Sequence, residues 1–156
     1  LRLNLVAPFI CIQTLVKKRI EYNRIRNNDD PFGIVILGSN TSYIAKTNTA
    51  AYGASKAGVN HMAACLNREL ALKGYFVTTL NFGPVSGTDM DRVTRAELHW
   101  QRGWDDEQYE NEIVKNIPQR RFTTREEIAE TAWFVINHGR MFGGRGVNFD
   151  SGQQQG

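Results

Sequence analysis

The sequence predicts an α/β fold built on a parallel β-sheet with flanking helices. Residues 34–37 (Ile-Val-Ile-Leu) form a continuous apolar run rich in β-branched residues, which is typical of a strand buried on both faces of a parallel sheet. A helix-like stretch at 50–73 follows, and residues 75–80 (Tyr-Phe-Val-Thr-Thr-Leu) have the pattern of a second strand. Strand, helix and strand in this order indicate a βαβ unit with parallel strands and a right-handed crossover.

The elements before and inside this unit follow from local patterns. Apolar residues near helical spacing predict a helix from residue 1 to about residue 21, and Pro8 predicts an early kink or a delayed start. A turn-forming cluster at 27–33 then leads into the first strand. The helix at 50–73 is expected to end at Gly74, a natural C-terminal stop.

The second half of the chain begins with a polar region at 89–119 that contains aromatic residues and one predicted helix, at about 106–116. Ser/Thr-x-x-Glu capping boxes at 123–127 predict another helix. A Gly-rich turn then leads to a short strand at 147–149. Because the sequence has no internal repeat and no linker, we expect residues 1–156 to form a single domain or part of one.

Composition argues against several kinds of function. The net charge of +3 is mild and the basic residues are scattered, so nucleic acid is not an expected partner. No apolar run approaches the roughly 18 residues of a membrane-spanning helix and no signal-peptide pattern is present, so we expect a cytoplasmic protein. The dispersed His61, His99 and His138 predict no metal site. Cys11 and Cys65 lack CxxC spacing and are expected to be small buried hydrophobic residues in a reducing compartment.

Tyr52 and Lys56 form the most informative pair in the sequence. They stand four residues apart in a predicted helix and therefore share one face of it. A nearby ammonium favours the phenolate and lowers the pKa of a tyrosine from about 10 toward working pH. Such a phenol can act as a general acid at a carbonyl or as a general base at an alcohol. The alternative is an ordinary surface pair, since short motifs alone are weak indicators.

Other polar and glycine residues follow the predicted strands. Ser39 comes directly after the first strand, and the segment from Gly83 to Thr88 comes after the second. Ligands of open α/β sheets bind beyond the carboxyl ends of the strands, so these residues are expected near Tyr52. The alternatives are a loop or capping serine at Ser39, a plain turn at Gly83–Pro84 and an ordinary helix-start residue at Asn4.

A series of short motifs runs in a fixed order along the whole chain. They are Asn4, Ser39, Tyr52-x-x-x-Lys56, Asn81-x-Gly-Pro-Val…Thr88, Ile117-Pro-x-x-Arg120…Glu126-Glu-Ile-Ala129 and Gly143-Gly…Val147-x-Phe-Asp150-Ser-Gly152. In order and spacing they resemble the short-chain dehydrogenase/reductase family. The resemblance implies that the sheet is part of a Rossmann-like, doubly wound parallel sheet.

The resemblance also implies roles for the catalytic residues. Tyr52 would be the general acid/base, and Lys56 would lower its pKa and hold the nicotinamide ribose. Ser39 would orient and polarise the substrate oxygen, with Ser42 as its rival for that role. Asn4 would hold a water molecule that connects Lys56 to solvent.

For the cofactor, the resemblance implies NAD or NADP. Besides Tyr52 and Lys56, the nicotinamide side would be lined by Gly83, Pro84, Val85 and Thr88, with backbone groups near Val85 meeting the carboxamide. The family's Asn-Pro-Gly turn is replaced here by Asn-Phe-Gly, and the path to Thr88 is one residue longer. The family's Gly-rich phosphate loop is missing from this sequence, so the chain is expected to be roughly the C-terminal three-fifths of such an enzyme.

The resemblance therefore implies an NAD(P)-dependent oxidoreductase that transfers hydride between nicotinamide and a ketone or alcohol. The alternative is a non-catalytic fragment or pseudo-subunit with an assembly role. Residues 89–119 would form the substrate lid, in which Met90, Trp100 and Trp104 would either face an apolar substrate or pack the lid onto its neighbours. The family's pairing of the helices that carry Asn4 and Tyr52 implies a homodimer or homotetramer; Phe9, Ala63 and Ala64 belong to their surplus apolar or small surface.

Overall fold

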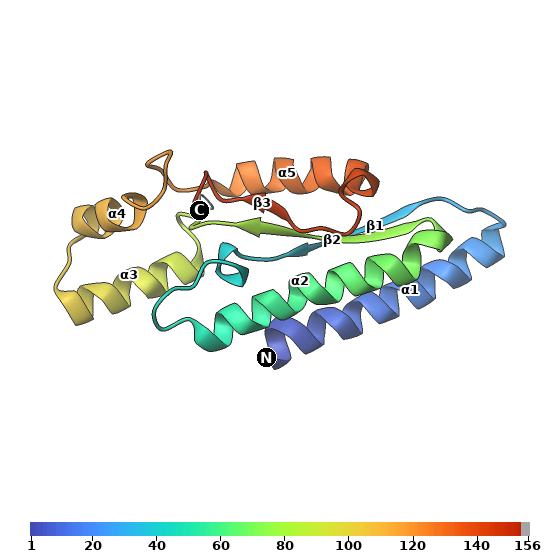
Figure 1. The fold of residues 1–156 in the computed structure, drawn as a ribbon, viewed down its shortest axis with the longest axis horizontal. Helices are drawn as coiled ribbons and strands as arrows, with labels where there is room; N and C mark the ends of the chain where they lie inside the picture. The colour runs from blue at the N-terminus through green and yellow to red at the C-terminus, as the bar shows by residue number, and fades with distance from the viewer. Residues whose placement is uncertain (154–156) are drawn as a thin grey trace.

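A three-stranded parallel sheet lies between two layers of helices (Figure 1). The computed structural model describes residues 1–153. The strands lie side by side in the order β1 (Phe32–Leu37), β2 (Tyr75–Phe82) and β3 (Val147–Phe149). The register of β1 on β2 runs from Phe32 opposite Tyr75 to Leu37 opposite Leu80. The α/β class and the parallel sheet predicted from the sequence are confirmed.

Helices cover both faces of the sheet and extend past one end of it. Two long helices lie against one face and one helix against the other, while a helical hairpin projects beyond the carboxyl ends of the strands (Figure 1). In that order they are α1 (Ala7–Arg26) and α2 (Ala50–Leu70), then α5 (Arg125–His138), then α3 (Asp89–Arg102) and α4 (Asp106–Val114). The described residues also form short helical turns, at Arg2–Val6, Asn40–Ser42, Ala71–Lys73 and Gly139–Phe142.

Local chemistry explains where several helices begin and end. Thr124 caps α5 with a reciprocal box: its Oγ1 accepts from the Glu127 N–H at 3.1 Å, and its own N–H donates to the Glu127 carboxylate at 2.9 Å. Pro8 lies in the first turn of α1, where no intrahelical N–H bond is required. A π-helical turn, Arg2–Val6, precedes α1, so the first helix starts irregularly where an early kink was expected.

The main difference from the sequence prediction is α3, which the sequence pattern did not reveal. Its buried side is narrow, since among its residues only Asp91 is buried. Thr88 begins the helix by accepting the Asp91 N–H at 3.1 Å, and Gly103, at φ +66°, ends it. Thr88 at the N-cap, acidic residues in the first turn and Gly103 at the end are local helix signals, and they were overlooked because the segment is mostly polar.

The core lies between β1, β2 and the helices α1 and α2. Its buried residues are Ile12, Val16, Ile34, Ile36, Val59, Ala63, Leu66, Leu70, Tyr75 and Val77. On the sheet, the ring of Phe76 fits against two glycines: a Cβ on Gly33 would lie 2.2 Å from it and a Cβ on Gly139 1.8 Å. Only glycine fits at these two positions without displacing the ring.

Two sequence expectations about burial are wrong. Cys11 and Cys65 are both exposed free thiols, because each lies on a side of its helix that no other described element covers. Leu37, the last residue of the predicted fully buried strand, is 51 % exposed, because β1 forms an edge of the sheet in the described residues.

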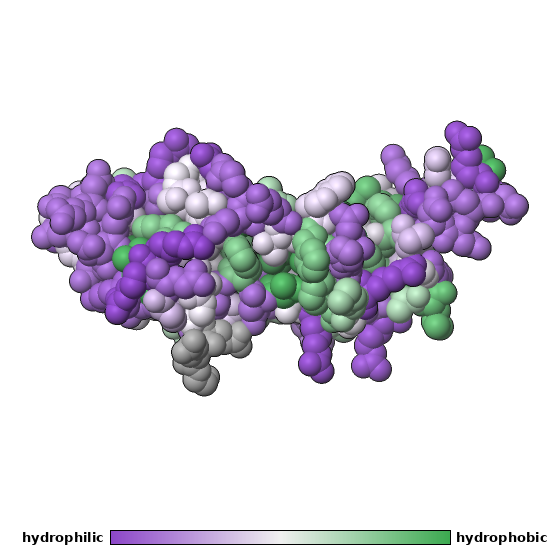
Figure 2. All heavy atoms as spheres, turned by 90° about the horizontal axis from the view of Figure 1, so that it is seen from above, coloured by the Kyte–Doolittle hydropathy of each residue, from purple (hydrophilic) through white to green (hydrophobic). Residues whose placement is uncertain are grey.

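Apolar side chains remain exposed on both helical layers. On α1 they include Phe9, Ile10, Leu15, Ile20 and Ile25. On the α5 side, Phe134 and Ile136 are exposed, and Figure 2, which views the molecule from that side, shows apolar side chains gathered near its middle between hydrophilic ends. Within residues 1–153, no helix has both the length and the hydropathy that crossing a bilayer requires.

Candidate active site

The predicted site residues converge at the carboxyl ends of the strands. Ser39 follows β1 at the start of the Asn40–Ser42 turn, and Gly83 directly follows β2. The turn and the α3–α4 hairpin lie at the same end of the sheet (Figure 1). This is the edge at which open α/β sheets bind their ligands.

Ser39 is buried, with 7 % of its surface exposed. Its Oγ accepts hydrogen bonds from the N–H of Thr41 at 3.2 Å and from the Thr41 hydroxyl at 2.9 Å. These two bonds occupy the acceptor capacity of the hydroxyl oxygen. The proton of Ser39 therefore remains for donation to an external acceptor such as a carbonyl oxygen.

Ser42 has a different set of bonds. Its hydroxyl donates to the backbone carbonyl of Ser39 at 2.7 Å and accepts from Nδ2 of Asn60 at 2.8 Å. The Oδ1 of Asn60 in turn accepts from the hydroxyl of Thr79, a buried residue of β2, at 2.5 Å. Ser42 thus uses its proton inside the turn, and it anchors the turn to α2 and to the sheet.

Tyr52 and Lys56 lie on successive turns of α2, as their spacing predicts. The Nζ of Lys56 is 5.7 Å from the centroid of the Tyr52 ring and donates to the carbonyl of Leu37 at 3.0 Å. Burial lowers the pKa of Lys56. Because Leu37 ends β1 two residues before Ser39, this bond ties the ammonium to the strand that positions the serine.

The first turn of α2 also touches the serine turn directly. A Cβ on Gly53 would lie 2.9 Å from the carbonyl oxygen of Thr41, so the absence of a side chain at Gly53 lets the two backbones approach. The residue next to Tyr52 is therefore packed against the loop that holds Ser39.

Asn4 reaches this region through Ser55. Its Nδ2 donates to the Ser55 hydroxyl at 3.3 Å, and that hydroxyl donates to the carbonyl of Tyr52 at 2.6 Å. Asn4 lies within the π-helical turn, a distortion that recurs at functional sites. The structure thus brings Asn4, Tyr52 and Lys56 together.

The expected nicotinamide-side residues, from Gly83 to Thr88, form a continuous wall at the ends of β2 and β3. The N–H of Gly83 donates to the carbonyl of Phe149 at 3.3 Å, and Val85 forms a parallel bridge with Thr123. The carbonyl of Pro84 accepts from the Thr123 N–H at 3.0 Å. The segment is therefore held in extended form beside the ends of β2 and β3.

The Thr88 side chain bonds both the segment before it and the helix α3. Its hydroxyl caps α3 and also lies 3.4 Å from the carbonyl of Val85, to which it donates. It connects the Gly83–Thr88 segment to the first turn of α3.

The region expected to be the lid, residues 89–119, is a hairpin of α3 and α4 with a polar centre. Tyr109 donates to Asp91 at 2.8 Å, and burial together with this carboxylate raises the pKa of Tyr109. Arg95 bonds Asp106 at 2.9 Å and Glu110 at 3.2 Å. These contacts join the two helices into one unit.

Two of the side chains expected to face a substrate, Met90 and Trp100, are exposed. Trp100 is 85 % exposed and Met90 62 % exposed. Trp104 is half-buried and stacks under the guanidinium of Arg102 at 4.7 Å. Trp100 therefore does not pack the lid onto the core of this chain.

Sequence reasoning missed a second polar cluster beside the site. Asn40, buried at 2 % exposure, and Asp150, at 6 %, belong to the serine turn and to the segment after β3, and Tyr43 joins them by donating to Asp150 at 2.9 Å. The sequence position of Asp150 could have indicated this cluster, because Asp150 follows a strand and therefore lies at the same sheet edge as Ser39.

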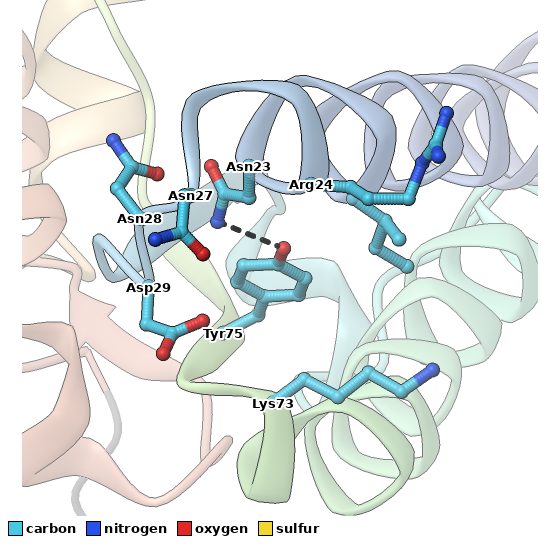
Figure 3. Close-up of a pocket in the computed structure, with 8 residues that line it drawn as sticks. Asn23, Arg24, Asn27, Asn28, Asp29, Lys73 and Tyr75 are labelled. Carbon is cyan, nitrogen blue, oxygen red and sulfur yellow. Dashed lines mark hydrogen bonds between the residues drawn. The ribbon is translucent and has the colours of Figure 1, made fainter.

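A surface cavity of about 440 Å³ lies at the opposite end of the sheet (Figure 3). It is lined mainly by the end of α1 and the segment after it, and Asn23 donates there to the hydroxyl of Tyr75 at 3.4 Å. Tyr75 begins β2, so this cavity borders the amino ends of the strands and is separate from the group around Ser39, Tyr52 and Lys56. Among the described residues no cluster of His, Cys, Asp and Glu could hold a metal ion.

Comparison with known proteins supports the same reading of the fold. Residues 1–99 match the family model described as short chain dehydrogenase. A curated relative, 3-oxoacyl-(acyl-carrier-protein) reductase FabG of Buchnera aphidicola subsp. Acyrthosiphon pisum (strain APS), is 24 % identical over 137 residues, which are 88 % of this chain and 48 % of the relative. The chain thus spans about half the length of that relative.

Solved structures agree with this match. A short chain dehydrogenase family protein from Francisella tularensis subsp. tularensis SCHU S4 superposes with a TM-score of 0.73 at 29 % identity, over 78 % of this chain and 50 % of that one. A variant of actinorhodin polyketide ketoreductase with NADPH gives a TM-score of 0.84 at 24 % identity, over 98 % and 57 %. A 4-hydroxyisoleucine dehydrogenase mutant complexed with NADH and succinate gives 0.76 at 22 % identity, over 98 % and 57 %.

Proposed function

This chain belongs to the short chain dehydrogenase family, and from that premise we propose that it carries the catalytic part of an NAD(P)-dependent oxidoreductase. The reaction is reversible hydride transfer between nicotinamide and a ketone or alcohol substrate. The observation that carries the proposal is the group formed by Tyr52, Lys56 and the buried Ser39 turn at the carboxyl edge of the sheet.

Each catalytic side chain has a distinct task in this proposal. The cofactor supplies and accepts the hydride, as nicotinamide does in general. Ser39 donates a hydrogen bond from its hydroxyl to the substrate oxygen, and Tyr52 transfers to that oxygen the one proton that completes the alcohol. The ammonium of Lys56 places a positive charge 5.7 Å from the centre of the Tyr52 ring. Ser42 has no free proton for this purpose, which supports Ser39 over Ser42.

The residues present fit a nicotinamide cofactor. After its bond to Leu37, the ammonium of Lys56 retains two N–H groups that can donate to a ribose diol. The segment with Gly83, Pro84, Val85 and Thr88 would line the nicotinamide, and backbone groups near Val85 would bind its carboxamide. The solved relatives contain NADPH in one case and NADH in another, and we propose NAD or NADP without preference.

Asn4 has a positioning role in this scheme. Through Ser55 it is bonded to the turn that carries Tyr52 and Lys56. We assign to it the water molecule that would connect Lys56 to solvent.

The comparison lengths support a further part of the proposal. The superposition includes 98 % of this chain but 57 % of the ketoreductase. We propose that the chain corresponds to the C-terminal part of such an enzyme, without its Gly-rich phosphate loop, and the order of the shared motifs supports this.

We also propose that the protein is a homodimer or homotetramer. The exposed Phe9 and the other apolar side chains along α1 support this assembly, as does the apolar patch on the α5 side. Ala63, which was expected on the free surface, is instead fully buried in the core. The same apolar surface also favours the alternative function, a non-catalytic subunit used for assembly.

Substitution of Tyr52 by Phe tests the catalytic proposal. NADH or NADPH oxidation is followed with a panel of ketones and aldehydes, and turnover by Tyr52→Phe should fall by about 10²–10⁴-fold because the transferable proton is gone. Cofactor binding should be nearly unchanged. Tyr22→Phe, at an exposed tyrosine on α1, is the matched control. Near-normal turnover by Tyr52→Phe would remove Tyr52 from the mechanism, and no turnover by the unaltered protein would favour the assembly role.

A further inference from the structure

The segment after β3, residues 150–153, crosses from one wall of the active site to the other. We call it the 150–153 bridge. It begins at the buried Asp150 and turns back through Ser151 and Gly152, both at positive φ (56° and 84°). The Asp150 carboxylate accepts from the Gly152 N–H at 3.1 Å, and the Asp150 carbonyl accepts from the Gln153 N–H at 3.2 Å. The turn is thus held by its own first residue.

On one side, the bridge holds the serine turn. The Oε1 of Gln153 accepts a short hydrogen bond from Nδ2 of Asn40, the residue directly after Ser39. The Oδ1 of the same Asn40 side chain accepts a hydrogen bond from Nζ of Lys46 at 3.2 Å. A second connection runs from the Tyr43 hydroxyl to Asp150 at 2.9 Å. Burial and this carboxylate raise the pKa of Tyr43, so Tyr43 stays a hydrogen-bond donor across the physiological range.

On the other side, the bridge lies against Gly83. A Cβ placed on Gly83 would lie 3.1 Å from Oε1 of Gln153 and 3.5 Å from the backbone of Asp150. The Gly83 N–H also donates to Phe149, the last residue of β3, at 3.3 Å. Gln153 therefore touches both the turn that holds Ser39 and the start of the wall assigned to the nicotinamide.

We propose that Gln153, held by Asp150, is a positioning residue that sets the separation between the Ser39 hydroxyl and the Gly83–Val85 wall. The proposal rests on the proposed function, in which the first group binds the substrate oxygen and the second lines the nicotinamide. Hydride transfer depends steeply on the distance between the reacting groups, and a 1 Å misplacement can lower a rate by about 10²-fold. Neither Gln153 nor Asp150 needs to touch the substrate for this role.

Two substitutions of Gln153 separate positioning from simple stabilisation. Gln153→Ala removes the acceptor for Asn40, whereas Gln153→Glu keeps an acceptor oxygen at that place. Gln13→Ala, at an exposed glutamine of α1, is the matched control. Tyr43→Phe breaks only the second connection, and it serves as an independent variant if Gln153→Ala does not fold.

The first measurement is hydrogen–deuterium exchange at residues 41–44, whose amides bond back into the serine turn. Gln153→Ala should speed this exchange by about fivefold or more, because local opening becomes easier. Gln153→Glu and Gln13→Ala should exchange at the rate of the unaltered protein. Unchanged exchange in Gln153→Ala, or equal acceleration in Gln153→Glu, would overturn the proposal.

The second measurement is steady-state reduction of diacetyl with NADPH. Gln153→Ala should lower kcat by about tenfold with KM for NADPH changed less, and Gln153→Glu should restore kcat to within about twofold. A decrease in thermal midpoint with normal kcat would mean a merely structural role and would overturn the proposal. If the unaltered protein turns over no carbonyl compound, the proposed function fails, and the exchange measurement alone decides the role of the bridge.

Discussion

Ser39 and Ser42 offer a sharp test of the proposed function, because their hydroxyl groups make different hydrogen bonds. In Ser42→Ala, the carbonyl of Ser39 loses a donor at 2.7 Å and Asn60 loses an acceptor at 2.8 Å. In Ser39→Ala, the turn loses the oxygen that accepts both bonds from Thr41. Either change weakens the turn, but only Ser39→Ala removes a free proton donor.

The expected magnitudes follow from these bonds. A buried group left without its partner costs about 1–3 kcal/mol, and because Ser42 and Asn60 are half-buried we expect about 1–2 kcal/mol of unfolding free energy for Ser42→Ala. Loss of one preorganised donor to a reacting oxygen lowers kcat by about 10²–10³-fold, which we expect for Ser39→Ala. For Ser42→Ala we expect a decrease in kcat of less than about tenfold, since Ser39 itself is retained.

Two assays on the same preparations measure these effects. Urea denaturation gives the change in unfolding free energy, and oxidation of NADPH with a saturating ketone gives kcat. The reasoning is refuted if Ser42→Ala lowers kcat as much as Ser39→Ala while its unfolding free energy is unchanged. It is equally refuted if Ser39→Ala keeps normal turnover.

Three further outcomes are expected. Lys56→Met should both slow turnover and weaken NADPH binding measured by fluorescence, because one ammonium serves both tasks; unchanged affinity would leave Lys56 only an electrostatic role. Arg121 holds the pKa of Glu127 down at about 2, against an ordinary value of 4.5, so this carboxylate stabilises the fold above pH 4.5 and the stabilisation is lost as pH falls toward 2. Denaturation midpoints of Glu127→Gln should therefore fall less steeply over that interval than those of Glu126→Gln, and parallel curves would contradict the assignment. Light scattering at micromolar concentration should show a dimer or tetramer that Phe9→Lys shifts toward monomer, and a monomeric unaltered protein would contradict the assembly proposal.

The sequence was informative where local rules decide the outcome. The i,i+4 spacing of Tyr52 and Lys56 placed them on one face of α2, and the capping box at Thr124 marked the start of α5. The short strand Val147–Phe149 was predicted with its observed bounds. These features depend on residues no more than a few positions apart.

Features that depend on distant contacts were not predictable. The packing of α3 on α4 depends on the bond between Tyr109 and Asp91, 18 residues apart, although α3 itself begins and ends at local signals, Thr88 and Gly103. The contact of Asn40 with Gln153 joins residues 113 positions apart. Burial of a helical cysteine depends on which neighbours cover that face, so Cys11 and Cys65 were misplaced for the same reason.

The helix α2 has a mechanical consequence that follows from its two attachments. Its first turns carry Tyr52 and Lys56, while Ala63, with no exposed surface, packs in the core. Eleven residues at 1.5 Å each separate Tyr52 from Ala63, a lever of about 16 Å. A tilt of about 4° at the core end therefore moves the phenol by about 1 Å, enough to change a rate by about 10²-fold. A bulkier residue at Ala63 would therefore shift the Tyr52 phenol and would lower the proposed activity, although Ala63 itself lies in the core.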